Sequence, residues 1–183
     1  MNRIVREWDW WAYNFRVVHR AQIPGISQWD DDLIDMVVEV LELEPGDRVL
    51  DLACGRGEHA VRLAKRGREV VGVDIAPSLV AHCQDRAASA AAQEGAATAR
   101  FQQACFQQGD MRELAYEGEF DAVLLLSGSF GFYDDATNED VLARMARALR
   151  PGGRVLIDVF DPTRMVVRPP RRSWSSYGGG YGL

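Results

Sequence analysis

The 183-residue sequence predicts an α/β fold, in which helices cover both faces of a doubly wound, mainly parallel sheet. Three observations support this prediction. Apolar strand patterns alternate with helical patterns, and such alternation builds right-handed strand–helix–strand units. A glycine turn at residues 55–57 joins the first predicted strand to its helix. The strand segments 120–127 and 154–160 carry apolar runs with no polar face, which is typical of strands covered on both sides.

The predicted core elements follow one another closely along the chain. Strands are expected at 48–53, 69–75, 104–108, 120–127 and 154–160, and helices at 58–66, about 77–92 and 138–149. We expect Thr137 or Asn138 to cap the last of these helices, because short polar side chains favour that position. The segment Pro151-Gly152-Gly153 predicts a turn into the fifth strand.

The N-terminal part of the chain predicts two further helices, at 4–20 and 30–43. The first is rich in aromatic residues, and the second begins with three aspartates at 30–32 that suit a helix N-terminus. We expect residues 1–45 to form a helical lid beside the sheet.

Composition limits the possible partners and compartments. The net charge of −6 argues against a nucleic-acid backbone as the principal partner. The three cysteines, Cys54, Cys83 and Cys105, lie far apart and without metal-ligand spacing to the histidines, so we expect reduced thiols in a cytoplasmic protein and no metal. No run reaches the roughly 18 apolar residues of a membrane span, and no signal-peptide core is present.

The glycine turn predicts a nucleotide-like ligand without specifying which one. Gly55, Gly57 and Ala60 fit the dinucleotide pattern G-x-G-x-x-G/A, which is weak evidence by itself. Asp74, at the end of the second predicted strand, is where an acid would bind ribose hydroxyls. Because dinucleotides and S-adenosylmethionine both contain ribose, Asp74 does not distinguish between them.

Asp51 does distinguish between them. It lies four residues before Gly55, so its carboxylate faces the turn where a pyrophosphate would sit. At about 5 Å, like charges cost on the order of 1–3 kcal/mol at an intermediate dielectric. The ammonium and sulfonium of S-adenosylmethionine would be attracted instead. The turn also lacks the G-K-[ST] of a phosphate-binding P-loop.

Five segments in order, between residues 48 and 159, carry a resemblance to a known family. They are VLDLACGRGEHA, VVGVDIAPSLV, QQGDMREL, FDAVLLLSGSFGFY and LRPGGRVLIDV. Together they resemble the motifs of the class I S-adenosylmethionine-dependent methyltransferases, with their Rossmann-like sheet. SGSFGFYDD and the aromatic N-terminus look closest to bacterial small-molecule methyltransferases of this class.

The resemblance implies a set of cofactor-binding residues, with S-adenosylhomocysteine as the product. Asp51 would lie near the ammonium, Asp74 would bind the ribose, and Asp110 would accept from the adenine amino group. The full implied set is Asp51, Ala53, Gly55, Gly57, Asp74, Ile75, Asp110, Met111 and Ser127, with Tyr13 in the lid. Purely structural interpretations stay open, above all Asp110 as a turn residue and Met111 as a core residue.

The implied reaction is in-line methyl transfer to a small-molecule acceptor. Phe130, Phe132 and Trp10 are the candidate acceptor contacts, although all three could be packing residues. We name no catalytic base. The signature N/D-P-P-Y/F/W of many DNA amino-methylating enzymes is absent at 127–130, which disfavours a DNA base. A non-catalytic S-adenosylmethionine-binding protein and an NAD-type oxidoreductase are the alternatives.

The end of the chain departs from the family pattern. Family members continue past the fifth strand with a helix and two more strands, whereas here residues 162–183 resemble the start of a substrate-covering insertion that is then cut short. We therefore expect a cofactor-binding core at 46–161. We also expect its fifth strand to lie at an open edge, which predicts pairing with a second copy of the chain.

Overall fold

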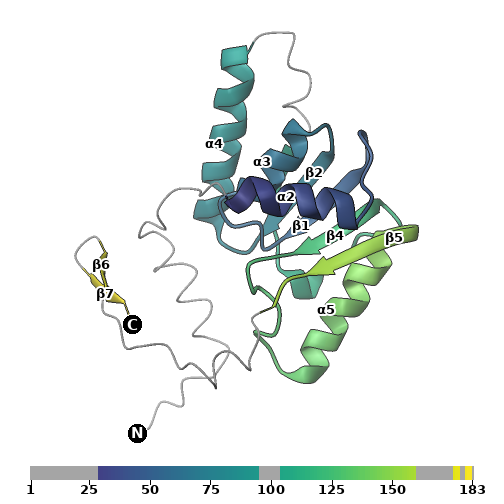
Figure 1. Ribbon diagram of the computed structural model, residues 1–183. Helices are drawn as coiled ribbons and strands as arrows, with labels where there is room; N and C mark the ends of the chain where they lie inside the picture. Colours follow the sequence, from purple (N-terminus) through teal and green to yellow (C-terminus); the bar gives the residue numbers. More distant parts are fainter. Residues whose placement is uncertain (1–28, 95–103, 160–174, 178–179, 183) are drawn as a thin grey trace, which may run out of the picture. The chain divides into compact units, whose positions relative to one another are not determined.

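The computed structural model describes residues 29–94, 104–159, 175–177 and 180–182 (Figure 1). The chain divides into two compact units, one of residues 26–158 and one of residues 1–25 with 159–183. Each is described by itself. The predicted helix at 4–20 lies outside the described residues, and so do Tyr13 and Trp10.

The larger unit is built on a five-stranded sheet with the order β3-β2-β1-β4-β5. Every neighbouring pair of strands in it is parallel. The strands are β1 (Arg48–Leu52), β2 (Glu69–Asp74), β3 (Ala104–Gln108), β4 (Phe120–Leu125) and β5 (Leu149–Ile157). This arrangement confirms the predicted doubly wound α/β fold.

Helices cover the two faces of the sheet (Figure 1). Side chains of α2 (Trp29–Val40), α3 (Glu58–Lys65) and α4 (Pro77–Glu94) share one buried cluster with Val49 of β1. Side chains of α5 (Asp135–Ala148) share a second buried cluster with Leu50. Successive residues of a strand point to opposite faces, so these two neighbours in β1 belong to the two separate halves of the core.

The N-cap of α5 differs from the residues predicted from the sequence. The N-cap is Asp134, whose Oδ1 accepts a hydrogen bond of 2.8 Å from the backbone N–H of Thr137. The helix therefore begins at Asp135, and the predicted caps Thr137 and Asn138 are wrong because both lie within its first turns. Asn138 instead donates its side-chain N–H to the carbonyl of Tyr133.

The predicted turn at 151–153 is likewise part of a strand. β5 begins at Leu149, and its register with β4 shifts between Phe120 and Ala122. A Cβ on Gly153 would lie 3.0 Å from the carbonyl oxygen of Asp121. Gly153 therefore allows the backbone to stay close to β4 where the pairing is irregular. Residues 150–153 form an irregular stretch within β5, between the pairs Phe120–Leu149 and Ala122–Arg154.

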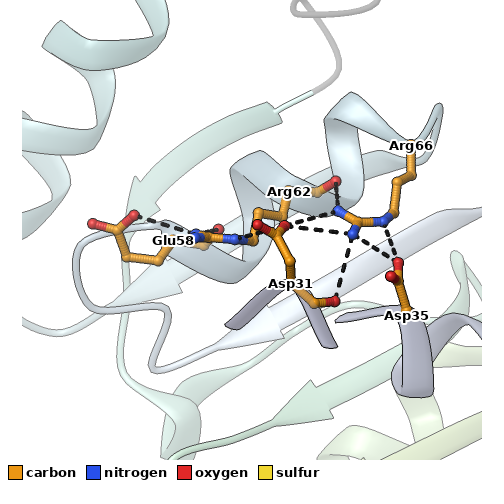
Figure 2. A network of polar contacts seen from close by, with 5 residues as sticks. All are labelled: Asp31, Asp35, Glu58, Arg62 and Arg66. Carbon is orange, nitrogen blue, oxygen red and sulfur yellow. Dashed lines mark hydrogen bonds and ion pairs between the residues drawn. The ribbon is translucent and has the colours of Figure 1, made fainter. Parts of the chain in front are cut away.

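A network of charged side chains joins α2 to α3 (Figure 2). Arg62 of α3 and Arg66, the C-cap of that helix, both pair with Asp31, at 3.0 and 3.4 Å, and Arg66 also reaches Asp35 at 2.7 Å. Glu58 lies 3.7 Å from Arg62 on the same helix. The aspartates are more than half exposed, so each pair contributes little alone, and the shared arginines mainly set the register of the two helices.

The smaller unit contributes an antiparallel pair, β6 (Ser175–Tyr177) and β7 (Gly180–Gly182). In the larger unit, β5 is the last strand at one edge of the sheet. Pairing of that edge with a second copy stays a prediction. Within the described parts of the chain, no helix combines the length and the apolar character needed to cross a bilayer.

Candidate functional site

The predicted site residues gather at the carboxyl ends of the strands. The chain order reverses between β1 and β4, and ligands of such folds bind at this switch point. Asp51 lies near the end of β1, Asp74 ends β2, Asp110 follows β3 and Ser127 follows β4. The N–H of Gly109 donates to the carbonyl of Asp74 at 3.0 Å, which joins the ends of β2 and β3.

Asp51 is an ionisable group buried with an unsatisfied oxygen. Asp51 is 1 % exposed, and its carboxylate accepts a hydrogen bond from the backbone N–H of Ala60. Among the described residues, nothing donates to its Oδ2. Burial, and secondarily the charge of Asp74, raise the pKa of Asp51 to about 7. A cation brought to this oxygen would relieve both effects.

The turn after β1 has an unusual backbone, with positive φ at Ala53 (+54°), Gly55 (+56°) and Gly57 (+73°). Asp74 holds this turn in place. Its Oδ2 accepts from the N–H of Gly55 and its Oδ1 from the N–H of Ala76, both at 2.8 Å. Asp74 thus fixes the glycine turn to the loop after β2. Its contact with a ribose remains a prediction.

The two glycines of the turn differ in what surrounds them. A Cβ on Gly55 would meet no atom within 4 Å, so its open side can face a ligand. A Cβ on Gly57 would lie 2.8 Å from the ring of Phe106 and 3.0 Å from the Sγ of Cys83. Phe106, which supports the turn, is not among the site residues predicted from the sequence. The available signal was a single aromatic residue in the otherwise polar end of β3.

Cys54 and Cys83 also pack beneath the turn. Both are buried, and the Cys83 thiol donates to the carbonyl of Gly55 at 3.4 Å. A hydrogen bond between the two thiols, with burial as a further cause, raises the pKa of Cys54. These contacts agree with the expected reduced thiols and place them on the protein side of the turn.

Residues at the adenine end of the predicted site lie partly in the core. Asp110 is the N-cap of a short 3₁₀ helix, η4 (Met111–Glu113), and its carboxylate accepts from the N–H of Arg112. Met111 packs against the buried cluster on the α5 face, and Ile75 is half-buried. Arg112, which is not among the site residues predicted from the sequence, forms an ion pair of 2.6 Å with Asp110.

The loop after β4 carries the residues predicted for the methionine end and the acceptor. Ser127 is exposed, has φ +59°, and donates its N–H to Asp158 at 3.2 Å. Phe130 packs against the α5-side cluster, so part of its ring is a core contact. Phe132 is half-buried.

A cavity of about 390 Å³ lies next to Asp110 and is lined by Val73 and by residues of 107–110 and 113–116. None of Asp51, Gly55 and Asp74 lines it. It therefore touches only one end of the predicted site. The carboxyl-end residues rather than this cavity define the place where the geometry favours a ligand.

Comparison with known proteins identifies the family. The model of a family described as "Methyltransferase domain" matches residues 49–153, which is more than half of the chain. The chain belongs to this methyltransferase family. The matched range begins in β1 and ends in β5, so it contains the glycine turn, Asp51, Asp74 and Asp110.

Relatives and solved structures agree with this membership. An uncharacterized methyltransferase of Synechocystis is 30% identical over 93% of this chain and 74% of its own length. A demethylmenaquinone methyltransferase of Thermus thermophilus is 34% identical, over 74% of this chain and 55% of its own length. The glycopeptide N-methyltransferase MtfA, solved with S-adenosylmethionine, has a TM-score of 0.56 at 27% identity, over 68% of this chain and 48% of its own.

These matches confirm the resemblance drawn from the five sequence motifs. S-adenosylmethionine, the cofactor that those motifs imply, is the cofactor of this family. The chain spans about half the length of most of the curated relatives it matches.

The burial of Asp51 predicts how stability depends on pH. Its pKa rises from 3.8 to about 7 on folding, so the ligand-free folded state binds the proton more tightly than the unfolded chain. Protonated Asp51 contributes on the order of 4 kcal/mol to the free energy of unfolding. This contribution is fully present below about pH 4 and is lost as the pH rises through 7. We expect Asp51→Asn to gain stability relative to the wild type over this range.

Urea denaturation of both ligand-free proteins between pH 4 and 8 measures this difference. Asp85→Asn, at an exposed position of α4, is the matched control and should run parallel to the wild type. A constant difference between Asp51→Asn and the wild type at every pH would contradict the assignment.

The two glycines give a second matched pair of variants. Gly55→Ala adds a methyl group to open space and should cost about 1 kcal/mol for the left-handed backbone alone. Gly57→Ala carries the same backbone cost and also forces Phe106 to move, so we expect about 3 kcal/mol. Thermal unfolding of the ligand-free proteins measures both, and equal losses would show that Phe106 does not support the turn.

Proposed function

We propose that this chain binds S-adenosylmethionine at the carboxyl ends of β1–β4 and transfers its methyl group to a small-molecule acceptor. The observation that carries the proposal is the buried Oδ2 of Asp51, which has no partner among the described residues. A buried carboxylate without a cation is costly, so its presence beside an open glycine turn favours a cationic ligand.

The charge of the site favours this cofactor over a dinucleotide. Asp51 and Asp74 are both buried and lie close enough for the charge of one to raise the pKa of the other. A pyrophosphate at the turn would add a third negative group to this pair. The ammonium of S-adenosylmethionine would instead supply the missing donor, which argues against an NAD-type oxidoreductase.

The residues present fit the parts of the cofactor. Asp51 would hold the ammonium, Ala53, Gly55 and Gly57 would let the backbone approach the methionine part, and Asp74 would fix that backbone while bordering the ribose. Ile75, Asp110 and Met111 would surround the adenine, and Ser127 would lie beside the methionine end. When bound, the cofactor supplies an activated methyl group on a sulfonium. The chain orients the partners for in-line displacement and excludes water.

Several observations favour a small-molecule acceptor. The segment after β4 reads Ser127-Gly128-Ser129-Phe130 rather than the signature of many DNA amino-methylating enzymes, and the net charge is −6. The Thermus thermophilus relative is named for a demethylmenaquinone substrate. Phe130 and Phe132 would contact the acceptor. Residues 1–28, with Trp10 and Tyr13, would form a lid, whereas α2 in the rest of the predicted 1–45 segment packs in the core, and residues 162–183 would begin a cover over the substrate.

Calorimetric titration tests the cofactor. We expect micromolar binding of S-adenosylmethionine and S-adenosylhomocysteine and no binding of NAD. Asp51→Asn should weaken the adenosyl ligands by about 10-fold or more, because a hydrogen bond to a charged group is worth about 1.5–3 kcal/mol. Asp85→Asn is the control and should bind as the wild type does. Equal affinities for NAD and S-adenosylhomocysteine would contradict the proposal.

Methyl transfer identifies the acceptor class. Methyl-labelled S-adenosylmethionine is incubated with the protein and with separated small-molecule, protein and nucleic-acid fractions of a bacterial extract. We expect label in the small-molecule fraction. Label in a macromolecular fraction would contradict a small acceptor, whereas cofactor binding with no transfer to any fraction would favour the non-catalytic alternative.

A further inference from the structure

We infer that Arg112 is a positioning residue of the cofactor site. It orients the Asp110 carboxylate so that one of its acceptor positions faces a single N–H donor of the ligand. This inference rests on the proposed function, in which that donor is the adenine amino group. Neither the five sequence motifs nor the family match assigns a role to Arg112.

Three N–H groups of Arg112 donate hydrogen bonds to the Asp110 carboxylate. Its backbone N–H donates to Oδ1 at 2.9 Å, and its Nη2 donates to Oδ2 at 2.6 Å. Its Nε–H lies between the two oxygens, at 3.0 Å from Oδ1 and 3.1 Å from Oδ2. A bidentate arginine fixes both the plane and the direction of a carboxylate, which a lysine would not do.

The number of hydrogen bonds leaves one place for a ligand. An ionised carboxylate offers about four acceptor positions. Arg112 supplies three hydrogens for them, because its single Nε–H is shared between Oδ1 and Oδ2, so one acceptor position has no hydrogen of its own. Among the described residues, no hydrogen bond is seen from any other donor to the Asp110 carboxylate, although the Asp110 backbone carbonyl accepts one from the N–H of Glu113. The Asp110 side chain keeps 13% of its surface exposed and lines the cavity next to it, so a bound molecule can reach this residue.

The charge state of Asp110 makes this position selective. Burial opposes ionisation, but the hydrogen bonds and charge of Arg112 outweigh it, and the pKa of Asp110 is lowered. An ionised carboxylate only accepts hydrogen bonds. It therefore favours an amino group and repels a carbonyl oxygen at the same place.

Arg112 is itself supported from the acceptor side of the site. The centre of its guanidinium lies 4.8 Å from the ring centroid of Tyr133, a cation–π contact. Tyr133 immediately precedes Asp134, the N-cap of α5, and ends the loop that carries Phe130 and Phe132. The Asp110 end of the cofactor site is thus connected through Arg112 to the predicted acceptor loop.

The test compares two ligands that differ at one group. S-inosylhomocysteine carries a carbonyl oxygen in place of the adenine amino group of S-adenosylhomocysteine. Calorimetry with the wild type should show a preference of at least about 30-fold for the adenosyl ligand, because a site built for a donor rejects an analogue that lacks it. If the wild type binds neither ligand, the proposed function fails, and this inference fails with it.

The variants separate positioning from simple structural support. Arg112→Ala should reduce the preference to below about 5-fold, and Arg112→Lys should restore little of it. Tyr133→Phe keeps the ring and should keep the preference, whereas Tyr133→Leu should lower it by about 3-fold. Arg144→Ala is the matched control, because Arg144 also holds the η4 segment, by donating to the Leu114 carbonyl at 3.0 Å, without contacting Asp110.

A purely structural role for Arg112 predicts a different pattern. Loosening of the 111–114 segment would weaken both ligands by the same factor in Arg112→Ala, as it would in Arg144→Ala, and the preference would stay at the wild-type value. That result, with normal wild-type binding, would overturn the inference while leaving the proposed function intact.

Discussion

The site depends on one electrostatic constraint, a carboxylate buried at the end of β1 with one of its two oxygens lacking a donor among the described residues. Asp51 is held there by the buried strand β1 and by a hydrogen bond from the first turn of α3. Neither the core nor the helix provides a donor for its second oxygen. The ligand-free fold is therefore less stable than it would be with a neutral residue, and the cofactor's ammonium is the group that would offset this cost.

The rest of the site maintains the geometry around that carboxylate. Asp74 uses both oxygens to hold backbone N–H groups, so the second acid is a brace for the glycine turn as well as a candidate ribose ligand. Phe106 packs against the underside of the turn at Gly57, which leaves the side of Gly55 open. At the adenine end of the predicted site, the N–H groups of Arg112 fix the orientation of the Asp110 carboxylate, as backbone N–H groups fix that of Asp74. Each acid thus has its orientation fixed before a ligand arrives.

Much of this arrangement could be predicted from the sequence, because it follows from strand ends. The bounds of β3 agree with the expected 104–108, and Asp51, Asp74 and Asp110 lie at the expected ends of strands. The errors arose where a side chain or a bulge overrides the local pattern. Asp134 caps α5 from the end of the aromatic-containing loop after β4, and β5 continues through two glycines that ordinarily indicate a turn.

Other features could not be predicted, because they depend on distances between atoms rather than on spacing along the chain. Where α3 places the N–H of Ala60 gives one oxygen of Asp51 a donor, and the other oxygen receives none from the described residues. The hydrogen bonds from Arg112 to Asp110 depend on the short 3₁₀ helix η4. A helix of three residues has no reliable pattern in a sequence.

The central claim is that the ionised Asp51 carboxylate receives the cofactor's ammonium, and proton release on binding tests it most directly. Titration with S-adenosylhomocysteine at pH 6, in buffers of different ionisation enthalpy, measures the protons exchanged. With a pKa of about 7 in the free protein, Asp51 is mostly protonated at pH 6 and must lose its proton to pair with a cation. We predict release of about 0.9 proton per ligand from the wild type and none from Asp51→Asn. Binding of the wild type without proton release at pH 6 would contradict the account.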